Sequence, residues 1–251
     1  GKVLIHELPF ADGVMGSTGG QLWPASVELG KYFLGKPWLV EGKSVIELGA
    51  GCGFASVIVA RLARWLLVTD GDEEIVDIMR KNLICNASFW RGQPVDGKIP
   101  PKDVFTQVLQ WENINELEWP EDSRVDVIIG SDIAYKNNHC TELTQVTEKL
   151  LKPGGIFYLF SETKRGGTTL FNDRMQLAGF DVEVLPHTNA EDDNFTVCIF
   201  TTPANSSDGS RHPNSDRWGA WNKPENWEEV QPSGYPSPYY CNIETGEIVW
   251  S

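Results

Sequence analysis

Four residues of one short loop have types and spacing suited to holding a ligand. Glu47 lies near the end of the apolar run Ser44–Leu48, and Gly49, Gly51 and Gly53 follow at alternate positions. Glycines at such a turn let the backbone bend sharply and approach a ligand closely. A loop that binds a dinucleotide needs the pattern G-x-G-x-x-G, and this loop lacks the third glycine. The acidic Glu47 also disfavours a phosphate, so the loop predicts a ligand other than a pyrophosphate.

An acid follows the next apolar run of the chain. Asp70 comes directly after the predicted strand 67–69, where its carboxylate can accept hydrogen bonds from both hydroxyls of a ribose. The alternative is a glycine turn in an unrelated α/β fold. Cys52, inside the glycine loop, has no apparent histidine partner and is interpreted as a small filler rather than a nucleophile.

Three further segments carry polar or aromatic groups next to predicted elements. The first is Thr18–Ser26, in which Trp23 precedes a proline that suits the first turn of a helix. The second is Leu109–Trp111, after the predicted strand 104–109. The third is Ser131–Tyr135, after the predicted strand 125–129. Its aspartate has an alternative role as a helix N-cap, and its tyrosine one in packing.

These residues together resemble a known family. The glycine loop resembles motif I of class I S-adenosylmethionine-dependent methyltransferases, E/D-x-G-x-G-x-G. The ordered segments between about residues 15 and 200 resemble the seven-β-strand protein methyltransferases that carry a D-x-x-Y signature, most of which methylate lysine. Asp132 and Tyr135 match that signature.

The resemblance implies S-adenosylmethionine as the cofactor and assigns a role to each matching residue. Asp132 and Tyr135 would face the substrate as the catalytic residues. Gln110 departs from the acid that many relatives carry, but its amide oxygen can still accept a hydrogen bond from adenine. The residues implied at the cofactor are Trp23, Glu47, Gly49, Gly51, Gly53, Asp70, Gln110, Trp111 and Ser131. No metal is expected, because the histidines and cysteines lack ligand spacing.

The resemblance favours methyl transfer to a lysine side chain of a protein partner, and it leaves alternatives. The fold could serve as a catalytically silent adaptor, or the target could be histidine, arginine or a small amine. Nucleobase methyltransferases have a D/N-P-P-Y motif at residues 131–135, and this chain has no proline there. The net charge of −14 agrees, because nucleic acids and anionic membranes attract basic surfaces.

The C-terminal segment 217–251 resembles a WW domain, a small three-stranded antiparallel module. Two tryptophans, Trp227 and Trp250, flank the turns at Ser233-Gly234 and Thr245-Gly246. The resemblance implies that Tyr239 and Trp250 form an aromatic groove for a proline-rich peptide. The alternative is a tail that only packs on the larger domain.

Alternating strand and helix patterns between residues 43 and 200 must position these groups. Helices are expected at 54–66, 73–86, 140–151 and 168–178, and further strands at 156–160, 182–185 and 195–200. This order predicts an α/β, Rossmann-like, seven-stranded and mostly parallel sheet with helices on both faces. We expect a methyltransferase domain at 1–202, a flexible linker at 203–216 and the WW-like module at 217–251.

The composition of the chain indicates the cellular compartment in which the protein is expected. The 251 residues include five scattered cysteines without a CxxC pair, which is typical of a reducing compartment. No apolar run is long enough to span a membrane. We therefore expect a monomer in the cytoplasm, the nucleus or both.

Overall fold

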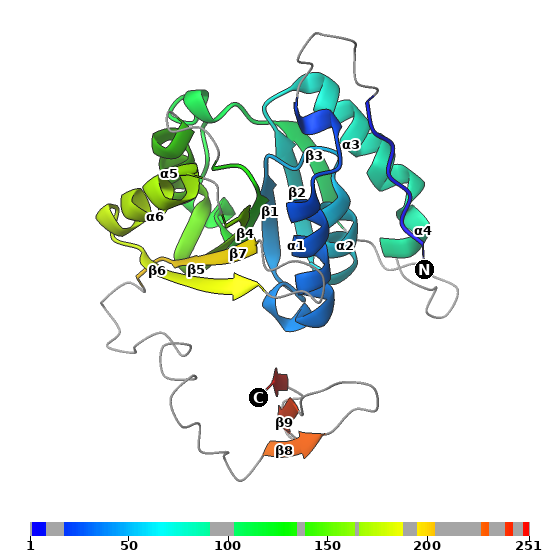
Figure 1. The fold of residues 1–251 in the computed structure, drawn as a ribbon, viewed down its shortest axis with the longest axis vertical. Coiled ribbons are helices and arrows are strands. Elements are labelled where there is room, and N and C mark those ends of the chain that lie inside the picture. Colours follow the sequence, from blue (N-terminus) through cyan, green and yellow to red (C-terminus); the bar gives the residue numbers. More distant parts are fainter. Residues whose placement is uncertain are drawn as a thin grey trace. The chain divides into compact units, whose positions relative to one another are not determined.

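The structure, a computed structural model, divides into two compact units, Gly1–Asn205 and Ser206–Ser251. Figure 1 shows both units. The residues that it describes are 2–8, 18–90, 103–134, 139–163, 166–187, 195–203, 227–230, 239–242 and 248–250. The predicted linker and Tyr135 lie outside these ranges, apart from Pro203 at the start of the linker.

A seven-stranded sheet in the order β3-β2-β1-β4-β5-β7-β6 forms the middle of the first unit. Only β7 runs antiparallel to its neighbours, so the predicted mostly parallel sheet is confirmed. The order reverses between β1 and β4, and such a switch point is where α/β sheets bind ligands. The strands are β1 (Ser44–Leu48), β2 (Trp65–Asp70), β3 (Asp103–Val108), β4 (Val125–Ser131), β5 (Leu151–Glu162), β6 (Asp181–His187) and β7 (Phe195–Thr201).

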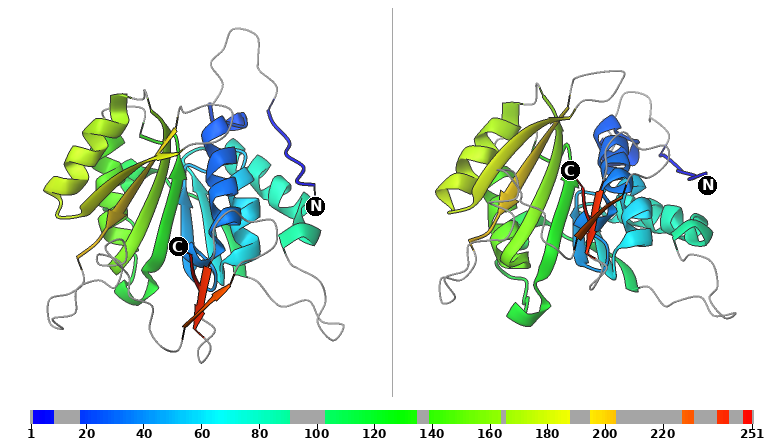
Figure 2. Two further views of the ribbon diagram at one scale, coloured as in Figure 1. Left: turned by 60° about the horizontal axis from the view of Figure 1, so that its bottom comes forward. Right: turned by 90° about the horizontal axis from the view of Figure 1, so that it is seen from below.

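Helices cover both faces of this sheet, as the views in Figures 1 and 2 show. One face carries α1 (Pro24–Gly35), α2 (Phe54–Leu62) and α3 (Glu73–Cys85), and α4 (Ala87–Trp90) follows α3. The other face carries α5 (His139–Leu150) and α6 (Gly166–Leu177). Short 3₁₀ turns complete the unit at η1 (Thr18–Gly20), η2 (Pro37–Leu39), η3 (Trp111–Asn113) and η4 (Glu121–Ser123).

The central strands are apolar on both faces because both faces are covered. Every residue of β1 is buried, and neighbours along the strand enter opposite cores. Val45 packs with α1, α2 and α3, whereas Ile46 packs with α5 and α6. Side chains of a strand alternate between the two faces, so a continuous apolar run is what a doubly covered strand requires.

Local differences from the expected elements lie at two ends. The helix expected to reach residue 66 ends at Leu62, because β2 already begins at Trp65. The helix expected to stop at the stretch Lys152–Gly155 already ends at Leu150, and this stretch lies inside β5, which begins at Leu151. A register shift between Val125 and Val127 of β4 absorbs this glycine-containing stretch, so it is an irregularity inside the strand.

The second unit contains a three-stranded antiparallel sheet in the order β10-β9-β8. Its strands are β8 (Trp227–Val230), β9 (Tyr239–Asn242) and β10 (Ile248–Trp250). The register pairs Trp227 with Asn242 and Trp250 with Tyr239. The turns expected between these strands lie outside the described residues.

Candidate active site

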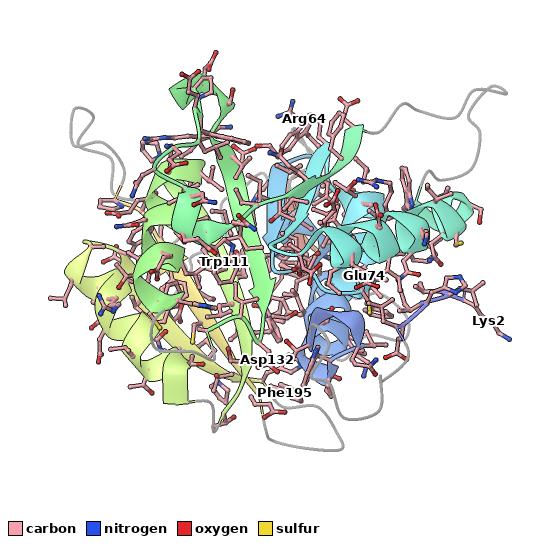
Figure 3. The ribbon with its side chains drawn as sticks, turned by 90° about the horizontal axis from the view of Figure 1, so that it is seen from above. Lys2, Arg64, Glu74, Trp111, Asp132 and Phe195 are labelled. Atoms are coloured by element: carbon pink, nitrogen blue, oxygen red, sulfur yellow. The ribbon has the colours of Figure 1, made fainter. Side chains whose placement is uncertain are left out.

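A cavity of about 330 Å³ lies at the carboxyl ends of β1, β2 and β4. In Figure 3, Trp111 and Asp132 lie near the middle of the view, between α1 on one side and α5 and α6 on the other. Eight of the residues predicted for the site line this cavity, namely Trp23, Gly49, Gly51, Asp70, Gln110, Trp111, Ser131 and Asp132. Residues from five separate parts of the chain therefore lie around one cavity.

The glycine loop needs glycine for two reasons. Gly49 and Gly51 both adopt positive φ angles, 59° and 55°, which side chains rarely allow. A Cβ on Gly49 would also come within 2.6 Å of Ile133, and one on Gly51 within 2.9 Å of the Gly19 carbonyl oxygen. The backbone of the loop can therefore lie directly against both the cavity and the neighbouring turn η1.

Asp70 ends β2 with its carboxyl group beside the glycine loop. The amide of Gly51 donates to Oδ2 at 3.0 Å and the amide of Asp72 donates to Oδ1 at 3.3 Å. Burial raises the pKa of Asp70 above its usual range, and these backbone donors oppose the shift. A carboxylate has about four acceptor positions, so both oxygens retain capacity for the two hydroxyls of a ribose.

Glu47 lies below the loop and does not line the cavity. Its side chain is wholly buried and accepts a hydrogen bond from the Ser56 hydroxyl of α2. The Oε1 atom has no partner among the described residues. Glu47 shares a strand face with Val45, and that face packs against α2. This alternation turns the Glu47 side chain into the core, so it does not line the cavity as the resemblance implied.

Burial also raises the pKa of Glu47 from 4.5 to about 8, and this predicts a pH-dependent stability. The folded state then holds a proton that the unfolded state releases between these values, so this stabilisation is full below about 4.5 and is lost as the pH rises through about 8. We expect the melting temperature of Glu47→Gln, relative to the unchanged protein, to rise from pH 5 to pH 8.5. Thermal melts of the cofactor-free proteins test this, and a constant difference would contradict it.

Aromatic groups form the rim of the cavity. The rings of Trp111 and His139 meet edge to face at 6.0 Å. The Trp111 indole Nε1 is buried and has no hydrogen-bond partner in the described part of the chain. Trp23 is 38% exposed, and its indole donates to the Thr18 carbonyl at 2.8 Å. Gln110 accepts a hydrogen bond from Asn113 at 2.9 Å, which orients its amide group at the cavity.

Asp132 has an unusual backbone at the end of β4. Its φ of 54° is the only positive φ of a non-glycine residue in the described ranges. Its amide donates to the Phe160 carbonyl at 2.7 Å, and its Oδ1 accepts from the Glu162 amide at 3.1 Å. Ile133 and Ala134 are described and are not helical, so Asp132 is not the N-cap of a helix that starts at Ile133. Strained positions held by neighbouring strands are often functional.

Several lining residues were not predicted from the sequence. His139 is the clearest, because it belongs to no motif and reaches the cavity only through the position of α5. Ile133 lay within a quoted segment but had no assigned role.

The described residues fit S-adenosylmethionine. Gly49 and Gly51 leave room for a ligand against the backbone, and Asp70 supplies the ribose acceptor. Trp111, with its unpaired indole nitrogen, provides an aromatic wall. No group of three or more potential metal ligands occurs within the described ranges. No helix of the same ranges is long and apolar enough to cross a bilayer.

Comparison with known proteins agrees with this geometry. The first unit resembles the crystal structure of a methyltransferase from Pyrococcus furiosus, with a TM-score of 0.52 and 17% identity over 73% of this chain and 88% of that one. Sheet order, switch-point cavity and glycine loop thus define a class I methyltransferase fold. Residues 5–178 match the family described as lysine methyltransferase, and the chain belongs to this family, whose cofactor is S-adenosylmethionine.

Curated relatives carry related names. The protein-lysine N-methyltransferase EFM3 of Chaetomium thermophilum is 30% identical over 61% of this chain and 45% of its own length. The protein N-terminal and lysine N-methyltransferase efm7 of Emericella nidulans is 32% identical over 53% of each chain. The chain therefore spans about half the length of these two relatives.

Proposed function

We propose that this protein transfers a methyl group from S-adenosylmethionine to the side-chain amine of a lysine in a protein partner. The observation that carries the proposal is the position of Asp132. Asp132 follows β4 and lines the same cavity as the glycine loop and Asp70. Membership of the lysine methyltransferase family supports the same chemistry.

The charges around the cavity suit a cationic substrate. Asp70, Glu112 and Asp132 line it, whereas no described lining residue is a lysine or an arginine. A lysine reaches such a site as an ammonium ion, and acids at the rim attract it. The net charge of −14 extends this preference to a basic protein surface.

The reaction needs an amine without its proton and a fixed geometry. Bound S-adenosylmethionine supplies an electrophilic methyl group. Transfer of the lysine from water into a narrow site lowers its pKa, because burial disfavours the charged form. Asp132 would then orient the amine toward the methyl group, and positioning of this kind provides most of the rate gain. Tyr135, outside the described residues, is proposed to line the same channel.

A labelled-methyl assay tests the proposal. The purified protein is incubated with methyl-labelled S-adenosylmethionine and a cell extract, and the labelled residue is identified by mass spectrometry. Methyl-lysine in a protein supports the proposal. If the label were found on a protein N-terminus, a histidine, an arginine or a small amine, that group would replace lysine as the proposed target. If calorimetry showed no binding of S-adenosylmethionine or of its demethylated product, the adaptor function would replace the enzyme.

We further propose that the second unit is a WW module that binds proline-rich segments. The antiparallel order β10-β9-β8 and the register that pairs Trp250 with Tyr239 support this proposal. These are the two residues expected to form the peptide groove. Such a module would hold a proline-rich partner near the catalytic unit through the linker and raise its effective concentration there.

The Trp250→Ala variant tests the second proposal. We expect it to reduce the affinity for a proline-rich peptide by at least about tenfold. A buried aromatic anchor commonly contributes about 2 kcal/mol or more to the binding free energy. Its affinity for S-adenosylmethionine should not change. Fluorescence titration with a labelled proline-rich peptide measures the first effect and calorimetry the second. An unchanged peptide affinity would exclude the groove.

A further inference from the structure

The N-terminal segment, residues 2–8, lies in an extended form alongside α3 (Figure 1). Two buried asparagines hold its backbone, Asn82 inside α3 and Asn86 at the C-cap of that helix. Asn86 accepts from the Leu4 amide at 2.9 Å and donates to the Leu4 carbonyl at 2.6 Å. Asn82 accepts from the His6 amide at 2.8 Å and donates to the His6 carbonyl at 2.9 Å.

The spacing of these pairs follows from the two geometries. Four residues of an α-helix rise about 6 Å, and two residues of an extended chain rise about 6.6 Å. Because the segment runs opposite to the helix, asparagines at i and i+4 meet backbone groups at j+2 and j. An asparagine side chain has both a donor and an acceptor, so each one satisfies both backbone groups of one residue.

Asn82 makes a further contact that connects this segment to the cofactor loop. Its Nδ2 also donates to the carbonyl of Cys52 at 2.8 Å, inside the glycine loop. The third hydrogen bond of Asn86 goes instead to the Asn82 carbonyl at 2.8 Å, within α3 itself. The two side chains are 0% and 3% exposed, so they match in burial and in number of hydrogen bonds but differ in their contact with the loop.

The other end of the segment contacts the wall of the cavity. The Leu8 amide donates to the Gly20 carbonyl at 2.9 Å, and Glu7 accepts from the Leu22 amide at 2.7 Å. A Cβ on Gly20 would lie 2.9 Å from the Leu8 Cβ, so the two backbones are closely packed. Leu22 and its neighbour Gln21, which donates to the Leu8 carbonyl, both line the cavity.

The turn η1 also contacts the glycine loop. The Cys52 thiol lies 3.6 Å from the Gly19 carbonyl, and the same carbonyl lies 2.9 Å from where a Cβ on Gly51 would be. The turn η1 is thus placed between the N-terminal segment and the glycine loop. Asn82 contacts both the N-terminal segment, at His6, and the glycine loop, at Cys52.

We propose that Asn82 is a positioning residue of the cofactor site, which holds the glycine loop and the N-terminal segment in register so that residues 2–8 form part of the cofactor-binding unit. The proposal rests on the cofactor site of the proposed function. Asn82 does not touch the cavity, and it acts through the carbonyls of His6 and Cys52. Asn86 holds the same segment without touching the loop.

Calorimetry with the demethylated cofactor product compares Asn82→Ala with its matched control, Asn86→Ala. We expect both variants to lose a similar amount of thermal stability, because each loses three hydrogen bonds, one of them buried and two partly buried. We expect Asn82→Ala to weaken binding about tenfold and Asn86→Ala less than about twofold. Equal effects of the two variants on affinity, or no effect of Asn82→Ala, would overturn the proposal.

Hydrogen exchange tests the coupling without cofactor. In the unchanged protein the Gly53 amide is bonded to the Ala50 carbonyl at 2.9 Å, so its exchange reports on the loop. We expect faster exchange at residues 50–53 in Asn82→Ala and not in Asn86→Ala. If the unchanged protein bound no cofactor, the proposed function would fail, and this measurement would still support or overturn the coupling.

Two further variants test the proposal if Asn82→Ala does not fold. Asn82→Asp keeps the size and the acceptor for the His6 amide but loses the donor to the carbonyls of His6 and Cys52, so it should still weaken cofactor binding. A chain that lacks residues 2–8 keeps the bond between Asn82 and Cys52. It should also bind the cofactor more weakly, because η1 loses its contacts with Leu8. Unchanged affinity in the shortened chain would show that the segment is not part of the unit.

Discussion

The variant Asp132→Asn is expected to lower the rate of methyl transfer by about a thousandfold while its affinity for S-adenosylmethionine stays within about twofold. Asparagine keeps the shape of the side chain, tolerates a positive φ and can still accept from the Glu162 amide. It removes only the negative charge that faces an incoming ammonium group. Rates with a labelled methyl donor and calorimetry with the cofactor measure the two effects.

Two further variants separate charge from structure. Asp132→Ala should lose the same activity and also some stability, because alanine at a left-handed position costs about 1–2 kcal/mol. Glu112→Gln removes another acid from the cavity rim, beside Trp111, so it should weaken the attraction of a basic substrate but leave the rate at saturating substrate nearly unchanged. Should Asp132→Asn retain full activity, Asp132 would be a structural residue of the β4–β5 junction.

The fold could be predicted from the sequence where the apolar pattern admits only one structure. The range Ser44–Leu48 was predicted as a strand and is β1, because its unbroken apolar run requires two covered faces. The helix expected at 73–86 is α3, which begins at Glu73 after Asp72 caps the Glu74 amide. The start of β5 at Leu151 was hidden, because proline and glycine usually end elements rather than lie within them.

The candidate site could be predicted to the extent that motifs fix it. Gly49, Gly51 and Asp70 lie together because a glycine loop and the end of the adjacent parallel strand must meet at one edge of the sheet. His139 and the N-terminal segment could not be found in this way. Their positions depend on contacts between distant residues, such as those of Leu4 and His6 with α3, and no local pattern records them.

The variant Asp70→Asn is expected to weaken the binding of S-adenosylmethionine and of its demethylated product by about a hundredfold. Two charge-assisted hydrogen bonds to a ribose become neutral, and each such change costs about 1–2 kcal/mol. The affinity of the unchanged protein should also fall as the pH is lowered, because burial raises the pKa of Asp70 and the carboxyl is then protonated earlier. Asp70→Asn removes this part of the pH dependence, since its amide does not titrate.

A neighbouring acid provides the matched control for Asp70. Asp72 lies two residues further along the same turn, caps α3 and does not line the cavity. Asp72→Asn keeps an acceptor for the Glu74 amide, so it should bind the cofactor as the unchanged protein does. Calorimetry at several pH values compares the three proteins. If Asp70→Asn and Asp72→Asn bound equally well, Asp70 would serve only to hold the Gly51 amide, and another group would have to bind the ribose.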